Sequence, residues 1–213
     1  MKIALFGASG TIGQRILKEA LSRGHHVTAI VRDPSRITES NPNLTVQPGN
    51  VLDAESVAKG VAGHDAVISA FGPGVSQGAS AVIDSVRSLI VGLGKAGVKR
   101  LEVVGGAGSL EVAPGLRLVD SPEFPLAWKE IALKHAEALE VLRNEGDNLE
   151  WTYVSPAALI QPGERTGKFR IGMDQLLSDG QGQSRISAED YAIALVDELE
   201  NRQHVRARFT VAY

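Results

Sequence analysis

The chain opens with a short apolar run, Lys2–Phe6, that leads straight into the glycine-rich turn Gly7-Ala8-Ser9-Gly10-Thr11-Ile12-Gly13. Glycines at this spacing let the backbone approach a pyrophosphate, and a helix that starts here points its free N–H groups at the negative charge. The spacing alone is a weak signal, because a chain with 23 glycines among 213 residues contains it by chance roughly 0.25 times. The context strengthens it, since apolar residues recur at helical spacing directly behind the glycines, at Ile12, Ile16, Leu17, Ala20 and Leu21. The sequence therefore predicts a dinucleotide-binding turn, with an ordinary glycine-rich loop as the alternative.

Strand-like and helical patterns alternate along the chain up to Pro156. Apolar runs typical of buried strands lie at Lys2–Phe6, His26–Val31, Leu44–Pro48, Ala66–Ala70, Arg100–Val104 and Trp151–Val154. Helical periodicity occupies Gly10–Ser22, Asp53–Val61 with Asp53 as N-cap, Ala79–Gly97 and Ala127–Arg143. This alternation is typical of parallel strands joined by crossover helices. We therefore expect an α/β fold with a doubly wound, mostly parallel sheet, a Rossmann fold.

The pattern changes after Pro156. The segment Gly163–Gly182 has polar, glycine-broken β character, a helix is expected from Ser187 to about Glu200, and Phe209–Tyr213 ends the chain as a strand. We expect residues 1–213 to form one nucleotide-binding domain, to which residues 157–213 contribute a small lobe that covers a substrate.

Composition excludes several classes of protein. A net charge of −3 and a pI near 6.0, with scattered Lys and Arg, predict no nucleic-acid partner. No apolar stretch has membrane-spanning length and no signal peptide precedes the first strand, so neither a membrane nor export by that route is expected. Absence of cysteine fits the cytoplasm. No metal is expected, because Asp174, Asp179 and Asp190 lack metal-like spacing with a histidine. We expect a monomer or homodimer that acts on a small molecule.

The end of the second predicted strand bears on the choice of cofactor. An acidic residue there binds the ribose 2′-OH of NAD, whereas an arginine accommodates the 2′-phosphate of NADP. The strand ends at Val31 and is followed by Arg32, and Arg36 lies about one turn downstream. The sequence therefore favours NADP. Asp33 is the alternative ribose ligand if the strand is one residue longer, and both arginines could instead be solvated loop residues.

Together with the glycine turn, the segments Val31-Arg32-Asp33-Pro34-Ser35-Arg36, Gly49-Asn50-Val51-Leu52 and Asp65-Ala66-Val67-Ile68-Ser69-Ala70 resemble the atypical short-chain dehydrogenase/reductases. The similarity is greatest to the NADH-flavin reductase branch, which is related to biliverdin reductase B/flavin reductase and to NmrA-like proteins. It covers essentially the whole chain, since Val104–Ser109, Trp151–Pro156 and Arg185–Ala192 also match. The motifs are specific for the fold and the cofactor, and much less so for the substrate.

The resemblance implies a cofactor site. Gly7, Ser9, Gly10, Thr11, Ile12 and Gly13 would hold the pyrophosphate, and Arg32 with Arg36 the 2′-phosphate. Asn50, Val51 and Leu52 would flank the adenine, and Ala70, Phe71 and Gly72 would pass beneath the ribose. The turn of Ser155 and Pro156 after the sixth strand is expected to pass the nicotinamide.

A missing motif is informative about the chemistry. Short-chain dehydrogenases that reduce carbonyls use a Tyr-x-x-x-Lys pair, in which the phenol protonates the oxygen as hydride arrives. Tyr153, Tyr191 and Tyr213 are the only tyrosines, and none has a lysine four residues later. A flavin or quinone spreads the incoming charge over a conjugated system and takes its proton from water. The sequence therefore argues against alcohol dehydrogenation and sugar epimerisation and leaves flavin-type reduction open.

Three polar residues are candidates for contact with the reacting groups. Ser109 lies near the position where the family supplies a serine, although backbone N–H groups of Gly105–Gly108 could take its place. Lys134 and His135 lie near the expected lysine and could bond the nicotinamide ribose, although surface solvation is favoured for at least one of them. The segment Leu110–Pro125 is expected to be a substrate loop.

Three functions remain open on the sequence. The leading one is an NADPH-dependent oxidoreductase that passes hydride to a flavin, quinone or similar flat acceptor. A non-catalytic NADP(H)-binding redox sensor of the NmrA-like type is the second. An epimerase of nucleotide-linked sugars is the third, and the missing tyrosine disfavours it.

Overall fold

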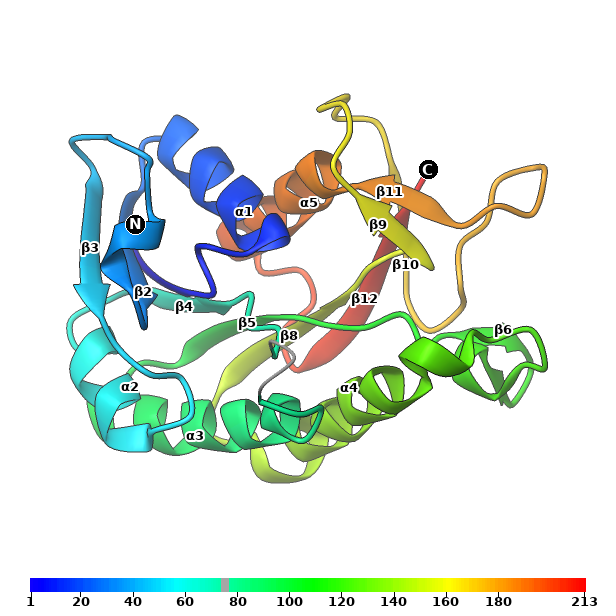
Figure 1. The fold of residues 1–213 in the computed structure, drawn as a ribbon, viewed down its shortest axis with the longest axis horizontal. Coiled ribbons are helices and arrows are strands. Elements are labelled where there is room, and N and C mark those ends of the chain that lie inside the picture. The colour runs from blue at the N-terminus through cyan, green and yellow to red at the C-terminus, as the bar shows by residue number, and fades with distance from the viewer. Residues whose placement is uncertain (74–76) are drawn as a thin grey trace.

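The computed structural model describes residues 1–73 and 77–213 and contains an eight-stranded central sheet (Figure 1). Its strand order is β10-β12-β8-β5-β4-β1-β2-β3, and every neighbouring pair is parallel except β10 with β12. The strands are β1 (Lys2–Phe6), β2 (His26–Val31), β3 (Leu44–Pro48), β4 (Ala66–Ser69), β5 (Arg100–Val104), β8 (Glu150–Ser155), β10 (Arg170–Gly172) and β12 (Ala207–Ala212). This is the doubly wound, mostly parallel α/β sheet expected from the sequence.

Helices cover both faces of the sheet (Figure 1). On one face α1 (Thr11–Ser22) packs against α5 (Ala188–Asn201), and on the other α2 (Ala54–Val61), α3 (Ala81–Ala96) and α4 (Leu126–Glu145) lie in a row. Each face has its own apolar core, because the strands are apolar on both sides and alternate side chains point to opposite faces. Asp53 caps α2 as expected, since its carboxylate accepts from the N–H groups of Glu55 and Ser56.

The predicted C-terminal lobe is not confirmed. β12 pairs in parallel with β8, and Phe209 together with Tyr191 of α5 lies in the same core as β1. A large part of residues 157–213 therefore completes the main sheet and its helical cover. Outside that sheet lie β9 (Leu159–Gln161) and β11 (Arg185–Ser187), which form a small parallel pair, together with their connecting loops.

Two other segments differ from expectation. The predicted substrate loop Leu110–Pro125 folds as a hairpin of β6 (Glu111–Ala113) and β7 (Leu116–Arg117), followed by the 3-10 turn η2 (Leu118–Asp120). Backbone hydrogen bonds between Glu111 and the segment Asp174–Leu176 hold this hairpin in place. Within Gly163–Gly182 the structure has one short strand, β10. No helix in the described residues is both long and apolar enough to cross a membrane.

Candidate functional site

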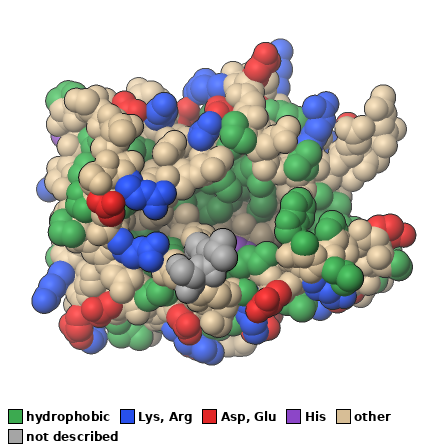
Figure 2. Space-filling model, in the orientation of Figure 1, with side chains coloured by type: hydrophobic (Ala, Val, Ile, Leu, Met, Phe, Trp, Pro, Cys, Tyr) green, Lys and Arg blue, Asp and Glu red, His purple; other side chains and the backbone are tan. Residues whose placement is uncertain are grey.

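The carboxyl ends of β1, β2 and β4 meet at one edge of the sheet and surround a hollow of about 500 Å³. Figure 2 shows this side of the molecule as a depression with hydrophobic side chains in its depth and Lys or Arg side chains grouped beside it. We call it the cofactor hollow, and its lining residues are Phe6, Gly7, Ser9, Gly10, Ile30, Val31, Arg32, Asp33, Arg36, Gly49, Asn50, Val51, Ala70, Phe71 and Gly72. Ten of these are residues that the sequence analysis assigned to the cofactor, brought together from four separate segments.

The three glycines of the turn have different reasons to be glycine. Gly7 has φ +77°, and a Cβ there would lie 2.3 Å from the carbonyl oxygen of Ala70. A Cβ at Gly13 would lie 2.0 Å from the carbonyl oxygen of Gly7. These two positions are therefore required by the fold itself. Gly10 differs, because its Cβ would meet one atom, the Gly7 carbonyl oxygen at 3.3 Å, and would otherwise project into the cofactor hollow.

The start of α1 is shaped to receive an anion. Gly10 is the N-cap and has no side chain to satisfy the first N–H groups of the helix. Thr11, the first helical residue, is exposed, Ile12 packs against the core, and Gly13 is buried against Gly7. Gln14 stabilises the turn, because its Nε2 donates to the carbonyl oxygen of Ser9 at 3.1 Å. An uncapped helix N-terminus next to open space favours a phosphate group.

The second strand ends at Val31, as predicted, and Arg32 and Arg36 both line the hollow. Neither guanidinium forms a hydrogen bond or an ion pair with any described residue. Oδ1 of Asp33 accepts from the backbone N of Ser35 at 3.1 Å and from its Oγ at 2.6 Å, whereas Oδ2 accepts from no described residue. These bonds cap the 3-10 turn η1 (Pro34–Arg36) and lower the pKa of Asp33. The hollow thus presents two guanidinium groups without an ion pair, together with the one carboxylate of Asp33.

The adenine side of the predicted site is ordered by local contacts. Asn50 donates its backbone N–H to Ser56 Oγ at 2.9 Å, and its side-chain oxygen accepts from the Leu52 N–H at 3.1 Å. Asn50 and Val51 line the hollow, whereas Leu52 packs against the core beneath α2 and α3 and does not line it. Ala70, Phe71 and Gly72 form the wall opposite and carry the chain away from β4.

The turn after β8 lies outside the residues that line the cofactor hollow. Ser155 and Pro156 are both buried, and Ser155 Oγ has no hydrogen-bond partner among the described residues. On the neighbouring strand Thr210, which is paired in register with Ser155, also has an unpartnered hydroxyl. A buried hydroxyl without a partner costs free energy, so this end of β8 retains unused hydrogen-bonding capacity where the nicotinamide is expected.

Ser109 faces away from the cofactor hollow. Its Oγ accepts from Arg208 Nη1 at 3.2 Å, and Arg208 is in turn paired with Asp174. All three residues line a separate cavity of about 640 Å³ between α4, β12 and the β6–β7 hairpin. The hydrogen bond between Ser109 and Arg208 could not be predicted from the sequence, because the two residues are distant in the chain and are brought together by the pairing of β12 with β8.

Lys134 and His135 are neighbours on α4 with different surroundings. Lys134 Nζ donates to both carboxylate oxygens of Glu137, at 2.9 and 2.8 Å, in an ion pair on the helix surface. His135 lies against Gly106 at the end of β5, where a Cβ on the glycine would come within 2.8 Å of the His135 Cβ. A serine at position 106 would collide with His135. The structure therefore brings His135, and not Lys134 or Ser109, to the end of β5.

Tyr153 and burial define the surroundings of His135. The Tyr153 hydroxyl donates to the carbonyl oxygen of His135 at 2.8 Å, and its oxygen accepts from the Gly106 N–H at 3.1 Å. The Tyr153 oxygen also lies 3.4 Å from His135 Nδ1, and the direction of that contact depends on which ring nitrogen carries the proton. Burial lowers the pKa of His135 to about 4, so the ring is neutral near pH 7.

These contacts bear on the alternative that backbone groups of Gly105–Gly108 replace a serine. The N–H of Gly105 donates to Val154 O at 2.8 Å and that of Gly106 to Tyr153, so both are already used. The N–H groups of Ala107 and Gly108 donate to no described residue, so the alternative stays open for these two.

Comparison with known proteins agrees with this geometry. A family of NAD(P)H-binding proteins matches residues 7–202. The chain belongs to this NAD(P)H-binding family. The uncharacterized protein YwnB of Bacillus subtilis (strain 168) is 44% identical over 214 residues, a match that covers 99% of this chain and 98% of the relative.

Solved structures of similar proteins support the same family. A putative exported protein from Burkholderia pseudomallei is 51% identical with a TM-score of 0.91, and the match covers all of both chains. A putative epimerase from Bacteroides thetaiotaomicron is 44% identical with a TM-score of 0.93, over 100% of this chain and 96% of that one. A putative NADH-flavin reductase from Streptococcus pneumoniae TIGR4 is 37% identical with a TM-score of 0.88, over 100% and 99%. The family is thus an oxidoreductase- and epimerase-like branch related to the atypical short-chain dehydrogenase/reductases.

The residues of this NAD(P)H-binding protein fit a nicotinamide dinucleotide. The uncapped start of α1 and the open position at Gly10 suit a pyrophosphate, and the hollow between the ends of β2 and β4 suits an adenosine.

Proposed function

We propose that this protein is an NADPH-dependent oxidoreductase that passes hydride to a flavin, a quinone or a similar flat acceptor. The observation that carries the proposal is the pair Arg32 and Arg36, two guanidinium groups that line the cofactor hollow without any described partner. A 2′-phosphate would supply the missing negative charge, and Arg binds phosphate in charge-assisted hydrogen bonds. Asp33, the alternative ligand for an unphosphorylated ribose, caps η1 through Oδ1 alone, so the titration of NADPH against NADH decides between it and the arginines.

The choice of acceptor rests on the lack of a proton donor at the end of β5. NADPH, when bound, supplies the hydride. Burial lowers the pKa of His135 to about 4, which keeps the ring neutral near pH 7, and it raises the pKa of Tyr153 well above its ordinary value. Lys134 is held in its ion pair with Glu137. An acceptor that delocalises the charge and takes its proton from water suits such a site, and a simple ketone or aldehyde does not.

Steady-state oxidation of NADPH tests the proposal. We expect turnover with riboflavin and a naphthoquinone, little turnover with aliphatic aldehydes and ketones, and a clear preference for NADPH over NADH. Tight NADP binding with background turnover for every acceptor would instead support a redox sensor. Conversion of a nucleotide-linked sugar without net oxidation of cofactor would support an epimerase. The cytoplasmic location and the monomeric or dimeric state stay predictions from the sequence.

A further inference from the structure

A second hollow of about 500 Å³ lies on the small parallel pair formed by β9 and β11. Leu159 and Gln161 of β9 and Arg185 of β11 line it, and the loop from Pro162 to Lys168 forms its wall. The ring of Tyr213 closes one side, with the Arg185 guanidinium 5.8 Å from the ring centroid. We call this the β9–β11 hollow.

A buried carboxylate organises the wall of this hollow. Asp190 of α5 is fully buried and accepts from the N–H groups of Thr166 and Gly167, both at 2.8 Å, and from Thr166 Oγ1 at 2.5 Å. The Asp190 carboxylate also accepts a hydrogen bond from the Tyr213 hydroxyl at 2.9 Å. One side chain therefore fixes the loop and the aromatic ring relative to each other.

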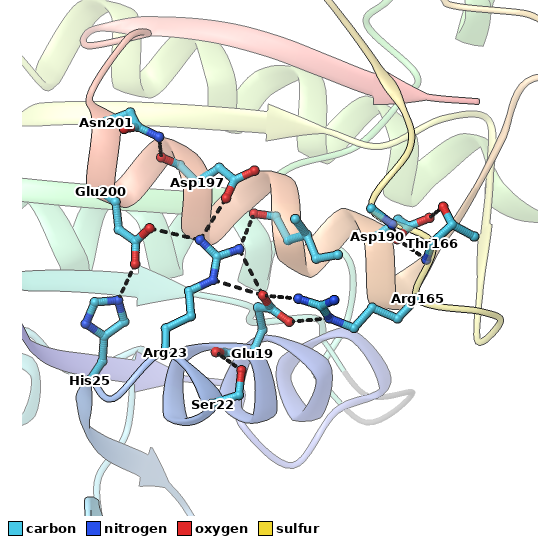
Figure 3. Close-up of polar contacts among 12 residues, drawn as sticks. Glu19, Ser22, Arg23, His25, Arg165, Thr166, Asp190, Asp197, Glu200 and Asn201 are labelled. Carbon is cyan, nitrogen blue, oxygen red and sulfur yellow. Dashed lines mark hydrogen bonds and ion pairs between the residues drawn. The ribbon is translucent and has the colours of Figure 1, made fainter.

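Contacts with α1 also hold the loop in place. Figure 3 shows Arg165 reaching from the loop to Glu19 of α1, with two hydrogen bonds of 2.9 Å each. The bonds to Arg165 and Arg23 lower the pKa of Glu19. On the same side Gly163 donates its N–H to Glu189, which is paired with Arg15 of α1. The loop is exposed along its length but is held at both ends, so its side chains line a preformed surface.

The cations of this hollow lack ionic partners. The side chains of Lys168 and Arg185 form no ion pair within the described part of the chain. One carboxylate, Glu164, also lines the hollow, and Asp179 lies near enough to feel the charge of Arg185, although backbone N–H groups of Gln183 and Gln181 dominate its lowered pKa. Among the side chains that line the hollow the two cations outnumber the one carboxylate, and the charge of Asp190 behind the wall is already satisfied by its hydrogen bonds. The exposed surface therefore suits an anion beside an aromatic ring.

The hollow lies close to the expected reaction centre. Leu159 lines it and is three residues beyond Pro156, the turn expected to pass the nicotinamide. Three residues of extended chain span at most roughly 11 Å. An acceptor whose ring lies at the nicotinamide can therefore extend a tail of ordinary length into the β9–β11 hollow.

We propose that the β9–β11 hollow is a subsite for the anionic tail of the acceptor, and that the acceptor is a flat ring system with a terminal phosphate. This inference rests on the proposed function. Lys168 and Arg185 bind the phosphate, and Tyr213, oriented by Asp190, contacts the tail. The prediction is a preference for a phosphorylated flavin over the same flavin without its phosphate.

Riboflavin and flavin mononucleotide form the matched pair for the test, because they share a ring system and differ in one phosphate. We would measure the binding of each flavin by fluorescence quenching in the presence of NADP⁺, and the KM of each with saturating NADPH. Two partly screened cation contacts predict that the wild type binds the phosphorylated flavin roughly 5- to 30-fold more tightly. That preference falls as salt is raised, because the contacts are exposed.

The double variant Lys168→Gln/Arg185→Gln removes both cations and is expected to abolish the preference while leaving riboflavin binding unchanged. Its matched control is Lys59→Gln/Lys99→Gln, which removes two exposed lysines that line no hollow. Equal affinity for the two flavins in the wild type, failure to bind either, or a preference retained in the double variant would overturn the subsite. A preference for binding flavin mononucleotide without any turnover would support the subsite and contradict the proposed function. Equal turnover of the two flavins would support the proposed function and contradict the subsite.

Discussion

The removal of Arg32 should change the choice of cofactor more than it changes cofactor binding in general. Arg32 lines the cofactor hollow and has no polar partner among the described residues, so its loss breaks no hydrogen bond or ion pair there. A hydrogen bond between charged groups contributes about 1.5–3 kcal/mol, and exposure to solvent places this one at the lower end. A loss of about 1.5 kcal/mol raises the Kd roughly tenfold.

Calorimetric titration of wild type and Arg32→Ala with NADPH and with NADH measures this effect. The Kd for NADPH should rise roughly tenfold, while the Kd for NADH, which has no 2′-phosphate, should change by less than about twofold. Arg36→Ala should act in the same direction, and the double variant should come close to equal affinity for the two cofactors. Arg87→Ala on α3, an exposed arginine outside the hollow, controls for the loss of one positive charge.

Two results would refute the assignment of the arginines. One is an equal loss for NADPH and NADH, which would place Arg32 against a part that both cofactors share. The other is a wild type that prefers NADH. In that case a ribose hydroxyl would be the group recognised, and Oδ2 of Asp33 would be available to accept from it with the Ser35 cap intact.

Three further outcomes follow from single side chains. Gly10→Val should abolish NADPH binding with little loss of thermal stability, because its Cβ meets one carbonyl oxygen at 3.3 Å; retained binding would place the cofactor elsewhere. Ser109→Ala, Lys134→Ala and His135→Ala should each lower turnover by much less than the ~10²-fold of a general acid; a thousandfold fall with binding unchanged would reveal a proton donor. Burial raises the pKa of Glu102 from 4.5 to about 8, so the folded state keeps a proton that the unfolded state has lost, and the free energy of unfolding should fall as pH rises through this window. The lowered pKa of His135 acts in the opposite direction below about pH 6.5 in both proteins, so the quantity to measure is the difference between them. Urea unfolding at both ends of the window should show the wild type losing stability relative to Glu102→Gln as pH rises, and parallel pH dependence would contradict it.

Sequence patterns predicted the part of the site that local chemistry dictates. The glycine turn, the end of β2 at Val31 and the Asp53 cap depend on a few adjacent residues, and the structure has all three as expected. The cofactor hollow also followed, because the ends of parallel strands must meet at one edge of the sheet. The prediction that these residues bind NADP still awaits the titration above.

The parts that could not be predicted depend on long-range pairing. Ser109 bonds Arg208 because β12 adds to the sheet beside β8, and the polar alternation of residues 163–182 gave no sign of that arrangement. Because of the same pairing, β12 belongs to the main sheet and not to the predicted C-terminal lobe. The segment after β10 supplies backbone hydrogen-bond partners for Glu111 in the β6–β7 hairpin. Without knowledge of those partners, a run rich in proline and glycine is predicted to be a loop.

The close approach of Gly106 and His135 decides what chemistry the end of β5 can perform. The glycine is obligatory because His135 occupies the space of its side chain, and His135 is fixed in turn by Tyr153. A hydroxyl donor at position 106 and the histidine are therefore mutually exclusive, and this chain has the histidine. Because burial keeps the ring neutral, His135 can orient a ribose hydroxyl or a polar group of the acceptor. A neutral imidazole is a much weaker acid than an imidazolium, so an acceptor that stabilises its own charge suits this site.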